Sequence, residues 1–197
     1  MNEQYQYARY LLESPRQGWK RFLDVQAPFR WHIRHLRPGF VLDIGCGIGR
    51  NLAHLKGDGV GIDINPYCVE IARAKGFEVF EPREFDQSEY DLPSRFDSIL
   101  VSHVLEHMTL TDGNVLLRER LLLLRSGGQL ILIAPQEAGY RADPTHIEFM
   151  DFAKLQGTCQ ELGLVVTHQY SFPFPRQAGR FFRYNEFVVI AKKLATD

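Results

Sequence analysis

The sequence has few cysteines and no long apolar run, and each absence excludes a class of protein. Its 197 residues include three cysteines, Cys46, Cys68 and Cys159, which are too scattered for a disulfide framework or a paired metal-binding motif. We therefore expect the reducing environment of the cytoplasm. No apolar run approaches the roughly 18 residues of a membrane-spanning helix, and the polar first four residues do not resemble a signal peptide.

The charge is nearly balanced in total but unevenly distributed along the chain. The formal net charge is −1, with 45% hydrophobic and 24% charged residues, which is ordinary for a soluble globular protein. Residues 16–37 nevertheless contain six Lys or Arg against one acid, whereas residues 58–97 contain ten acids against four bases. This asymmetry is compatible with an anionic partner and equally with a solvated helix face.

The most informative stretch is residues 40–50, where a short apolar run passes into three alternate glycines. The run predicts a strand buried on both faces, and residues 51–55 read as the opening of a helix. Gly45, Gly47 and Gly49 allow a tight turn and leave room for a ligand to approach the backbone. The spacing is one residue tighter than the dinucleotide fingerprint. It predicts a turn whose N–H groups face a polar ligand, with a plain turn as the structural alternative.

A second short apolar strand, residues 60–64, carries an acid at its end. Asp63 lies twenty residues after Asp43 and is followed by Asn65 and Pro66, which suit the cap and the first position of a helix. In nucleotide-binding α/β units an acid at this point accepts hydrogen bonds from the ribose hydroxyls. We therefore predict that Asp63 binds a ribose.

Together, residues 41–49 (VLDIGCGIG) and residues 61–63 (GID) resemble the cofactor site of class I S-adenosylmethionine-dependent methyltransferases. The resemblance covers roughly residues 38–170 and is closest to the small-molecule subgroup that includes the ubiquinone-biosynthesis enzymes. It implies a Rossmann-like, doubly wound α/β sheet of seven strands in the order 3-2-1-4-5-7-6, mostly parallel with a C-terminal antiparallel hairpin. It also implies an N-terminal helical cap over residues 1–37, before a methyltransferase domain over residues 38–197.

The order of elements agrees with that fold. Further strands are expected at residues 77–80, 96–102, 129–134, 164–170 and 185–192, and helices at residues 28–36, 66–75, 115–124 and 152–162. The alternation of buried strands with helices predicts a doubly wound parallel sheet.

The resemblance implies S-adenosylmethionine as cofactor, S-adenosylhomocysteine as product, and a set of binding residues. That set is Asp43, Gly45, Cys46, Gly47, Arg50, Asp63, Ile64, Glu81, Ser102 and His103. Glu81 occupies the position of an acid that meets the adenine amino group. Because Pro82 has no N–H, the ring contact usual in the family has to be made differently or near Arg83.

For proton transfer the candidates are His146 and, as the alternative, His107. His146 follows Pro144 on an expected loop, where a polar side chain is free to point into the cleft, and an imidazole can take a proton near neutral pH. A structural histidine is the alternative for either residue. No metal is expected, because no His, Cys or Asp cluster shows ligand spacing and no acid cluster matches the magnesium site of the catechol-methylating relatives.

Residues 173–184 form an expected loop with three arginines and four aromatic residues. Its length suggests a lid on the acceptor side. Because few acids are nearby in sequence, Arg176, Arg180 and Arg183 favour a carboxylate or phosphate on the acceptor.

We predict a methyltransferase with a small-molecule, anionic acceptor. A nicotinamide dehydrogenase is disfavoured by the glycine spacing and the terminal hairpin, and a non-catalytic interaction protein of the same fold stays open. Nucleic acid is the weaker acceptor, because no recognisable nucleic-acid module accompanies the basic segments. The sequence leaves open whether oxygen, nitrogen or carbon is methylated, and it does not specify the oligomeric state.

Overall fold

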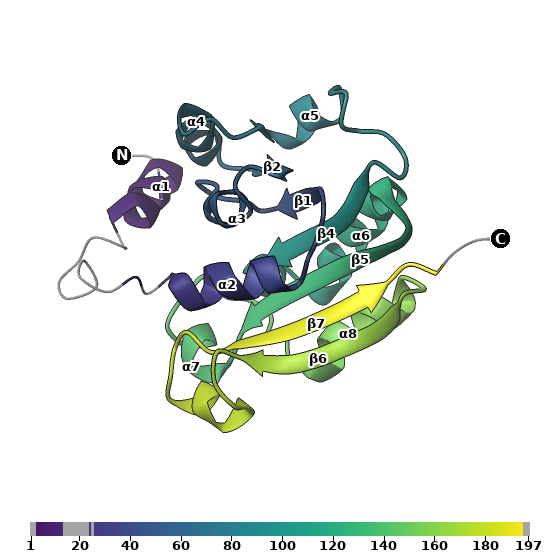
Figure 1. Cartoon of the computed structure of the whole chain (residues 1–197). Coiled ribbons are helices and arrows are strands. Elements are labelled where there is room, and N and C mark those ends of the chain that lie inside the picture. The colour runs from purple at the N-terminus through teal and green to yellow at the C-terminus, as the bar shows by residue number, and fades with distance from the viewer. Residues whose placement is uncertain (1–2, 14–23, 25, 195–197) are drawn as a thin grey trace. The chain divides into compact units, whose positions relative to one another are not determined.

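The computed structural model describes residues 3–13, 24 and 26–194. Seven strands form one sheet in the order β3-β2-β1-β4-β5-β7-β6 (Figure 1). This order confirms the expected sheet topology and fold class. Part of the basic segment, including Arg16, Lys20 and Arg21, lies outside the described residues.

The strands are β1 (Val41–Ile44), β2 (Gly59–Ile62), β3 (Val79–Phe80), β4 (Phe96–Ser102), β5 (Leu124–Pro135), β6 (Val165–Phe172) and β7 (Glu186–Lys192). The helices are α1 (Glu3–Glu13), α2 (Ala27–His35), α3 (Arg50–His54), α4 (Pro66–Ala74), α5 (Pro82–Phe85), α6 (Leu110–Arg120), α7 (Glu137–Tyr140) and α8 (Phe152–Glu161). Single 3-10 turns occur at η3 (Leu105–His107), η4 (Leu121–Leu123) and η5 (Arg176–Arg180).

One boundary differs clearly from the prediction. Residues 126–128 were expected to separate a helix from a strand, but β5 already begins at Leu124 and includes them. The reason is pairing at the far end of the chain: Gly127 N donates to Lys193 O (3.0 Å), and Lys193 N donates to Gly128 O (2.9 Å). Tertiary hydrogen bonds therefore override the local turn preference of glycine.

The chain separates into two compact units, one of residues 1–38 with 42–90 and one of residues 39–41 with 91–197. This division differs from the expected one at residues 37 and 38. In the first unit α1 packs on α4, with the rings of Tyr5 and Tyr67 5.4 Å apart and Ala8 buried against Ile48 and Cys68. The N-terminal helices are thus part of the unit that carries the glycine motif.

Packing in the first unit explains its two short central strands. The cluster below the glycine motif contains Cys46, Leu52, Val69, Ala72 and Val79. A Cβ on Gly61 of β2 would lie 2.5 Å from the sulfur of Cys46, so this position has to be glycine for the strand and the motif to pack.

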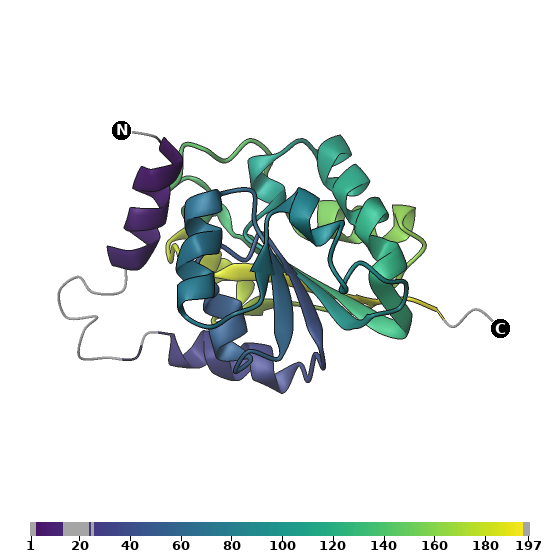
Figure 2. The ribbon, with the colours of Figure 1, turned by 90° about the horizontal axis from the view of Figure 1, so that it is seen from above.

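In the second unit β5 is the centre of a mixed sheet. It pairs in parallel with β4 and antiparallel with β7, which pairs antiparallel with β6. This confirms the expected terminal hairpin. Helices α6 and α8 lie on the same side of these strands (Figure 2). Among the described helices, none has the length and apolarity to cross a membrane.

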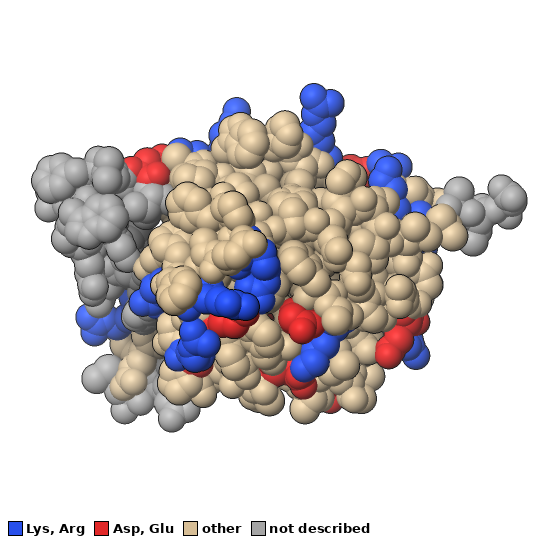
Figure 3. Space-filling model, turned by 90° about the horizontal axis from the view of Figure 1, so that it is seen from below, with Lys and Arg blue, Asp and Glu red and all other residues tan. Residues whose placement is uncertain are grey.

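Two of the described basic residues of the basic segment are engaged locally. Arg30 of α2 pairs with Asp24, and Arg34 Nε donates to the carbonyl oxygen of His54 (2.5 Å). On the face shown in Figure 3, Lys and Arg side chains lie beside Asp and Glu side chains, without a broad area of one sign. These contacts favour the helix-face interpretation for the described part of the basic segment.

Candidate functional site

The glycine motif forms a turn that requires glycine. Gly45, Gly47 and Gly49 have φ angles of 70°, 54° and 78°, in the left-handed region. The N–H groups of Gly45 and Cys46 donate to Ile62 O (2.8 and 3.1 Å), which ties the turn to the end of β2. The backbone of the turn is therefore fixed by its conformation and by β2.

Asp43, at the start of this turn, has an unusual environment. Its side chain is 0% exposed. Oδ1 accepts one long hydrogen bond from Asn51 Nδ2 (3.4 Å), and Oδ2 accepts none from the described residues. Burial raises the pKa of Asp43 to about 7; the Asn51 contact opposes the shift and the Asp63 charge adds to it. A buried carboxylate oxygen without a donor is costly, so a ligand with a donor or a positive charge would fit it.

Asp63 holds the turn from the other side. Its Oδ2 accepts a hydrogen bond from Gly47 N (2.7 Å), and its Oδ1 accepts one from Asn65 N (2.8 Å). Burial raises the pKa of Asp63, against these two backbone bonds. Each carboxylate oxygen has a further lone pair, so hydroxyl groups of a ligand can still bind. The next residue, Ile64, is 78% exposed, and an exposed isoleucine beside such an acid provides an apolar surface for a flat ring.

The other expected cofactor residues in this unit have partners of their own. Arg50 donates to Leu11 O of α1 (2.8 Å), and Asn65 Nδ2 donates to Gln4 O (2.9 Å), so α1 covers the turn. Cys46 is buried, and burial raises the pKa of its thiol. Glu81 precedes α5, and its N–H donates to the Glu84 carboxylate (3.0 Å). Pro82 occupies the first turn of α5, where its missing N–H costs nothing.

In the second unit His103 follows Ser102, the last and half-buried residue of β4. Its φ of 58° turns the chain sharply. The ring Nε2 donates to Glu186 Oε1 (2.8 Å), and Nδ1 lies 3.3 Å from Glu106 Oε1. Desolvation of the His103 ring by surrounding protein atoms disfavours its charged form. The carboxylates of Glu106 and Glu186 outweigh this effect and raise the pKa of His103 to about 10. His103 is therefore a cation at neutral pH and unsuited to accept a proton.

His146 does not point freely from its loop, and that expectation is wrong. Its side chain is 7% exposed. Nδ1 bonds Tyr140 O (2.8 Å), the ring stacks on that of Tyr140, and the His107 ring lies 4.7 Å away. The structure thus brings the two catalytic candidates together, in a cluster with Glu106 that sequence reasoning missed.

Glu106 is the key residue of that cluster, with a side chain that is 0% exposed. One ligand-type atom from each of Glu106, His107 and His146 lies within 4.8 Å of the others. No metal was expected, because the spacing of these residues along the chain gave no signal. An acid beside His107 in an otherwise apolar segment was the available clue.

Among the arginines of residues 173–184, Arg176 is neutralised by an acid, which was not expected. Arg176 forms a two-pronged ion pair with Glu137 of α7 (2.8 and 2.5 Å) and lies over the Phe187 ring at 4.7 Å. The inference of a free charge, drawn from the few acids nearby in sequence, therefore does not hold for Arg176, because its partner lies 39 residues earlier. Arg183 lies over the Tyr184 ring. Arg180 and Arg183 form no ion pair with a described acid.

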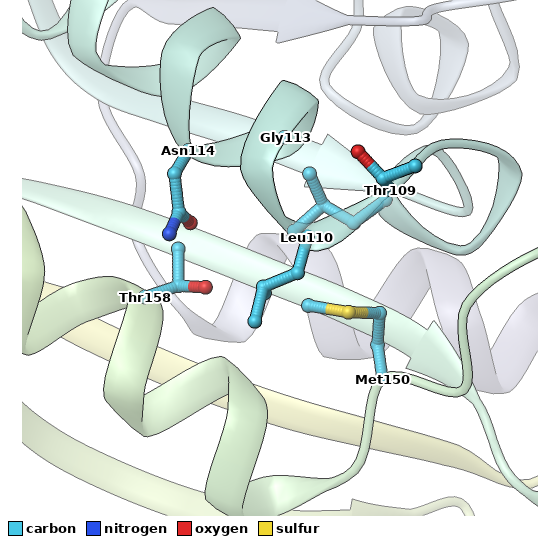
Figure 4. Close-up of a pocket in the computed structure, with 7 residues that line it drawn as sticks. Thr109, Leu110, Gly113, Asn114, Met150 and Thr158 are labelled. Atoms are coloured by element: carbon cyan, nitrogen blue, oxygen red, sulfur yellow. The ribbon is translucent and has the colours of Figure 1, made fainter.

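A separate shallow pocket lies between α6 and α8 (Figure 4). Its lining residues are Leu105, Thr109, Leu110, Gly113, Asn114, Met150 and Thr158. It has essentially no room even for a water molecule, whereas ligand pockets begin at roughly 300 Å³. We therefore do not regard it as the acceptor site.

Comparison with known proteins adds family information to this geometry. A family model described as a methyltransferase domain matches residues 7–169. The ubiquinone biosynthesis O-methyltransferase of Xanthomonas oryzae pv. oryzae is 34% identical over 100 residues, 47% of this chain and 41% of that protein. The ajmaline N-methyltransferase of Rauvolfia serpentina is 34% identical over 110 residues, 50% of this chain and 36% of that protein. The match thus spans less than half the length of these curated relatives.

Solved structures share the fold at low identity. A SAM-dependent methyltransferase from Archaeoglobus fulgidus superposes with a TM-score of 0.66 at 20% identity, covering 95% of this chain and 100% of that one. The magnesium protoporphyrin IX methyltransferase of Synechocystis, solved with bound SAM, gives 0.63 at 14% identity, with 98% of each chain covered. A chain of the Haloferax volcanii complex of the Trm112 activator with a putative methyltransferase gives 0.69 at 16% identity, with 99% of each covered.

Proposed function

The chain belongs to the methyltransferase-domain family, whose model covers most of its length, and we propose that it methylates a small-molecule acceptor with S-adenosylmethionine. The fold is that of class I S-adenosylmethionine-dependent methyltransferases. The observation that carries the proposal is the glycine turn held between the buried Asp43 and the half-buried Asp63, of which Asp43 has an oxygen without a donor among the described residues.

The residues of the first unit fit this cofactor. Asp43 would accept from the ammonium group of the methionine portion, and Asp63 from the ribose hydroxyls. Ile64 would lie against the adenine, with Glu81 toward its amino group. Cys46 packs in the cluster under the glycine turn, and Arg50 ties the turn to α1. When bound, the cofactor supplies a methyl group on a positively charged sulfur.

The chain itself has to align the acceptor and exclude water. In a doubly wound sheet, ligands bind outside the carboxyl ends of the strands where the strand order reverses. In the family that the sequence resembles, the segment after this strand flanks the methionine end of the cofactor, and we propose that role for Ser102 and His103 after β4. Among the imidazoles, we propose His146 as proton acceptor, with His107 as the alternative, because His103 is held as a cation.

The proposal of a small acceptor is supported by relatives whose names specify ubiquinone biosynthesis and ajmaline. An anionic group on the acceptor is the finer part of the proposal. Its support is Arg180 and Arg183, since Arg176 is engaged by Glu137.

Release of S-adenosylhomocysteine, measured by mass spectrometry with a panel of small acceptors, tests the proposal. Turnover with a small acceptor supports it, and His146→Gln should then lower kcat by roughly a hundredfold or more while cofactor affinity stays unchanged. Methylation of RNA or DNA alone would replace it with the nucleic-acid alternative. Cofactor binding without turnover of any acceptor class would favour the interaction protein.

A further inference from the structure

The Glu106 cluster contains more hydrogen-bond acceptors than donors, and the donor beside it is His103 Nδ1, 3.3 Å from Glu106 Oε1. Neither carboxylate oxygen of Glu106 accepts a hydrogen bond from the described residues, although the side chain is fully buried. The backbone around it is well fixed, because Ile147 N and Glu148 N both donate to Glu106 O (2.7 and 3.1 Å). The carboxylate is therefore held in place with its oxygens unsatisfied.

Both histidines beside Glu106 have Nδ1 engaged by a neighbour, which leaves Nε2 to meet a ligand. The Tyr140 carbonyl can only accept, so His146 Nδ1 carries the proton and, in the neutral ring, Nε2 carries the lone pair. His146 Nε2 lies 4.0 Å from Glu106 Oε1, too far for a hydrogen bond between them.

A chain of hydrogen bonds places the ring proton of His107 on Nδ1 as well. The Thr145 hydroxyl donates to Asp143 Oδ1 (2.6 Å), so it accepts from His107 Nδ1 (3.2 Å). The Nε2 of a neutral His107 ring is then also an acceptor. On the other side of Glu106, the single cation His103 is shared with Glu186. Around Glu106 the contacts just described therefore include one cation, His103, and three carboxylates, those of Glu106, Glu186 and Asp143.

We propose that the cluster binds the amino group of the acceptor, so that the enzyme is an N-methyltransferase for primary or secondary amines. An ammonium group offers several N–H donors and a positive charge, which would complement the acceptors of Glu106 and the two histidines where His103 is the single cation. This inference rests on the proposed function and names its substrate class. An anionic group elsewhere on the same acceptor is compatible with it.

The spacing favours an amine over a metal ion. Glu106 Oε1 and His146 Nε2 are 4.0 Å apart. If each lies about 2.8 Å from one amine nitrogen, they form an angle of roughly 90° at that nitrogen, which tetrahedral N–H groups can meet with slightly bent hydrogen bonds. The same two atoms, each about 2.1 Å from a zinc ion, would subtend roughly 145°, far from tetrahedral or octahedral geometry. A metal bound by these two atoms would have to draw them closer together.

The cluster also provides the chemistry that N-methylation needs. The ammonium group loses a proton to His146 Nε2 or to the Glu106 carboxylate. The freed nitrogen lone pair then forms the new bond to the methyl carbon, and the sulfur keeps the electron pair of the bond that breaks. The positive charge of the sulfonium thereby passes to the methylated nitrogen, the proton taken by the base leaves to solvent, and no other reactant is required.

The test compares matched small probes by ligand-observed NMR on the full chain with saturating S-adenosylhomocysteine. The probes are benzylamine, benzyl alcohol and benzoate, and butylamine, butanol and butyrate, with zinc and magnesium titrated separately by calorimetry. We expect the amines to bind at least tenfold more tightly than their matched alcohols. Glu106→Gln should remove that preference, because charge-assisted hydrogen bonds contribute about 1.5–3 kcal/mol, or roughly 10- to 100-fold.

Glu148→Gln is the matched control, since it removes one carboxylate that pairs with Lys154 instead of the cluster. It should leave amine binding intact. If Glu106→Gln does not fold, His146→Gln serves as the second variant. Equal binding of amines and alcohols, a preference that survives both variants, or a zinc or magnesium ion bound tightly at Glu106 would overturn the inference. Absence of S-adenosylhomocysteine binding in the parent would instead overturn the proposed function.

Discussion

Replacing Asp43 by asparagine should make the cofactor-free protein respond differently to pH. The Asp43 carboxyl is fully buried, and burial raises its pKa to about 7. The folded state therefore favours the protonated form, and the stability that this group contributes is present below the unfolded pKa of about 3.8. It is lost as pH rises toward 7. Asparagine resembles the protonated acid and does not titrate.

The size of the effect follows from the two pKa values. A rise from about 3.8 to about 7 corresponds to roughly 4 kcal/mol when the acid is fully ionised. About 2–3 kcal/mol of this develops between pH 5 and pH 8. The free energy of unfolding of Asp43→Asn minus that of the parent should rise by this amount over that range. The new amide N–H₂ adds a constant offset, since it too lacks a partner.

Urea denaturation at several pH values, on parent and variant without cofactor, measures this difference. Asp97→Asn is the control: its acid has a lowered pKa, because Phe40 N and Arg125 donate to it. Asp97 is therefore ionised in both states throughout pH 5–8, and its variant should show a difference that does not change with pH. A pH-independent difference for Asp43→Asn as well would refute the account of the Asp43 environment.

Two further predictions concern the turn and the arginine segment. Gly49→Ala should destabilise the protein by about 2 kcal/mol, because left-handed φ costs about 1–2 kcal/mol and the new Cβ would lie 2.7 Å from Phe77; an unchanged Tm would contradict it. Arg176→Gln should lower stability by about 1 kcal/mol through loss of its Glu137 pair, with the acceptor KM unchanged. Arg180→Gln should instead raise KM without lowering the Tm. Steady-state kinetics and thermal melts on both arginine variants check this pair, and the reverse pattern would contradict it.

The fold was predictable from the sequence because its signals are local. Each central strand is a short apolar run next to a turn signal, and Asn65 with Pro66 begins α4 as predicted, with the Asn65 side chain accepting from Tyr67 N (3.1 Å). The glycine turn and Asp63 could be located for the same reason. Only the start of β5 differed clearly, where pairing with Lys193 decides the conformation.

The acceptor side was less predictable because its contacts join distant segments. The pair of Arg176 with Glu137 and the approach of His146 to Glu106 each link residues about 40 positions apart. Neither spacing leaves a pattern in one sequence. A buried Glu106 looks like any surface acid until the fold places it, so the residue most informative about the acceptor was missed.

The central claim is that the glycine turn between Asp43 and Asp63 binds S-adenosylmethionine, and calorimetric titration with S-adenosylhomocysteine tests it most directly. We predict one binding site per chain in the parent. In Asp63→Ala the affinity should fall by roughly 10- to 100-fold, from the loss of about 1.5–3 kcal/mol of charge-assisted hydrogen bonding. No heat of binding in the folded parent, or equal affinity in a folded Asp63→Ala variant, would contradict the claim.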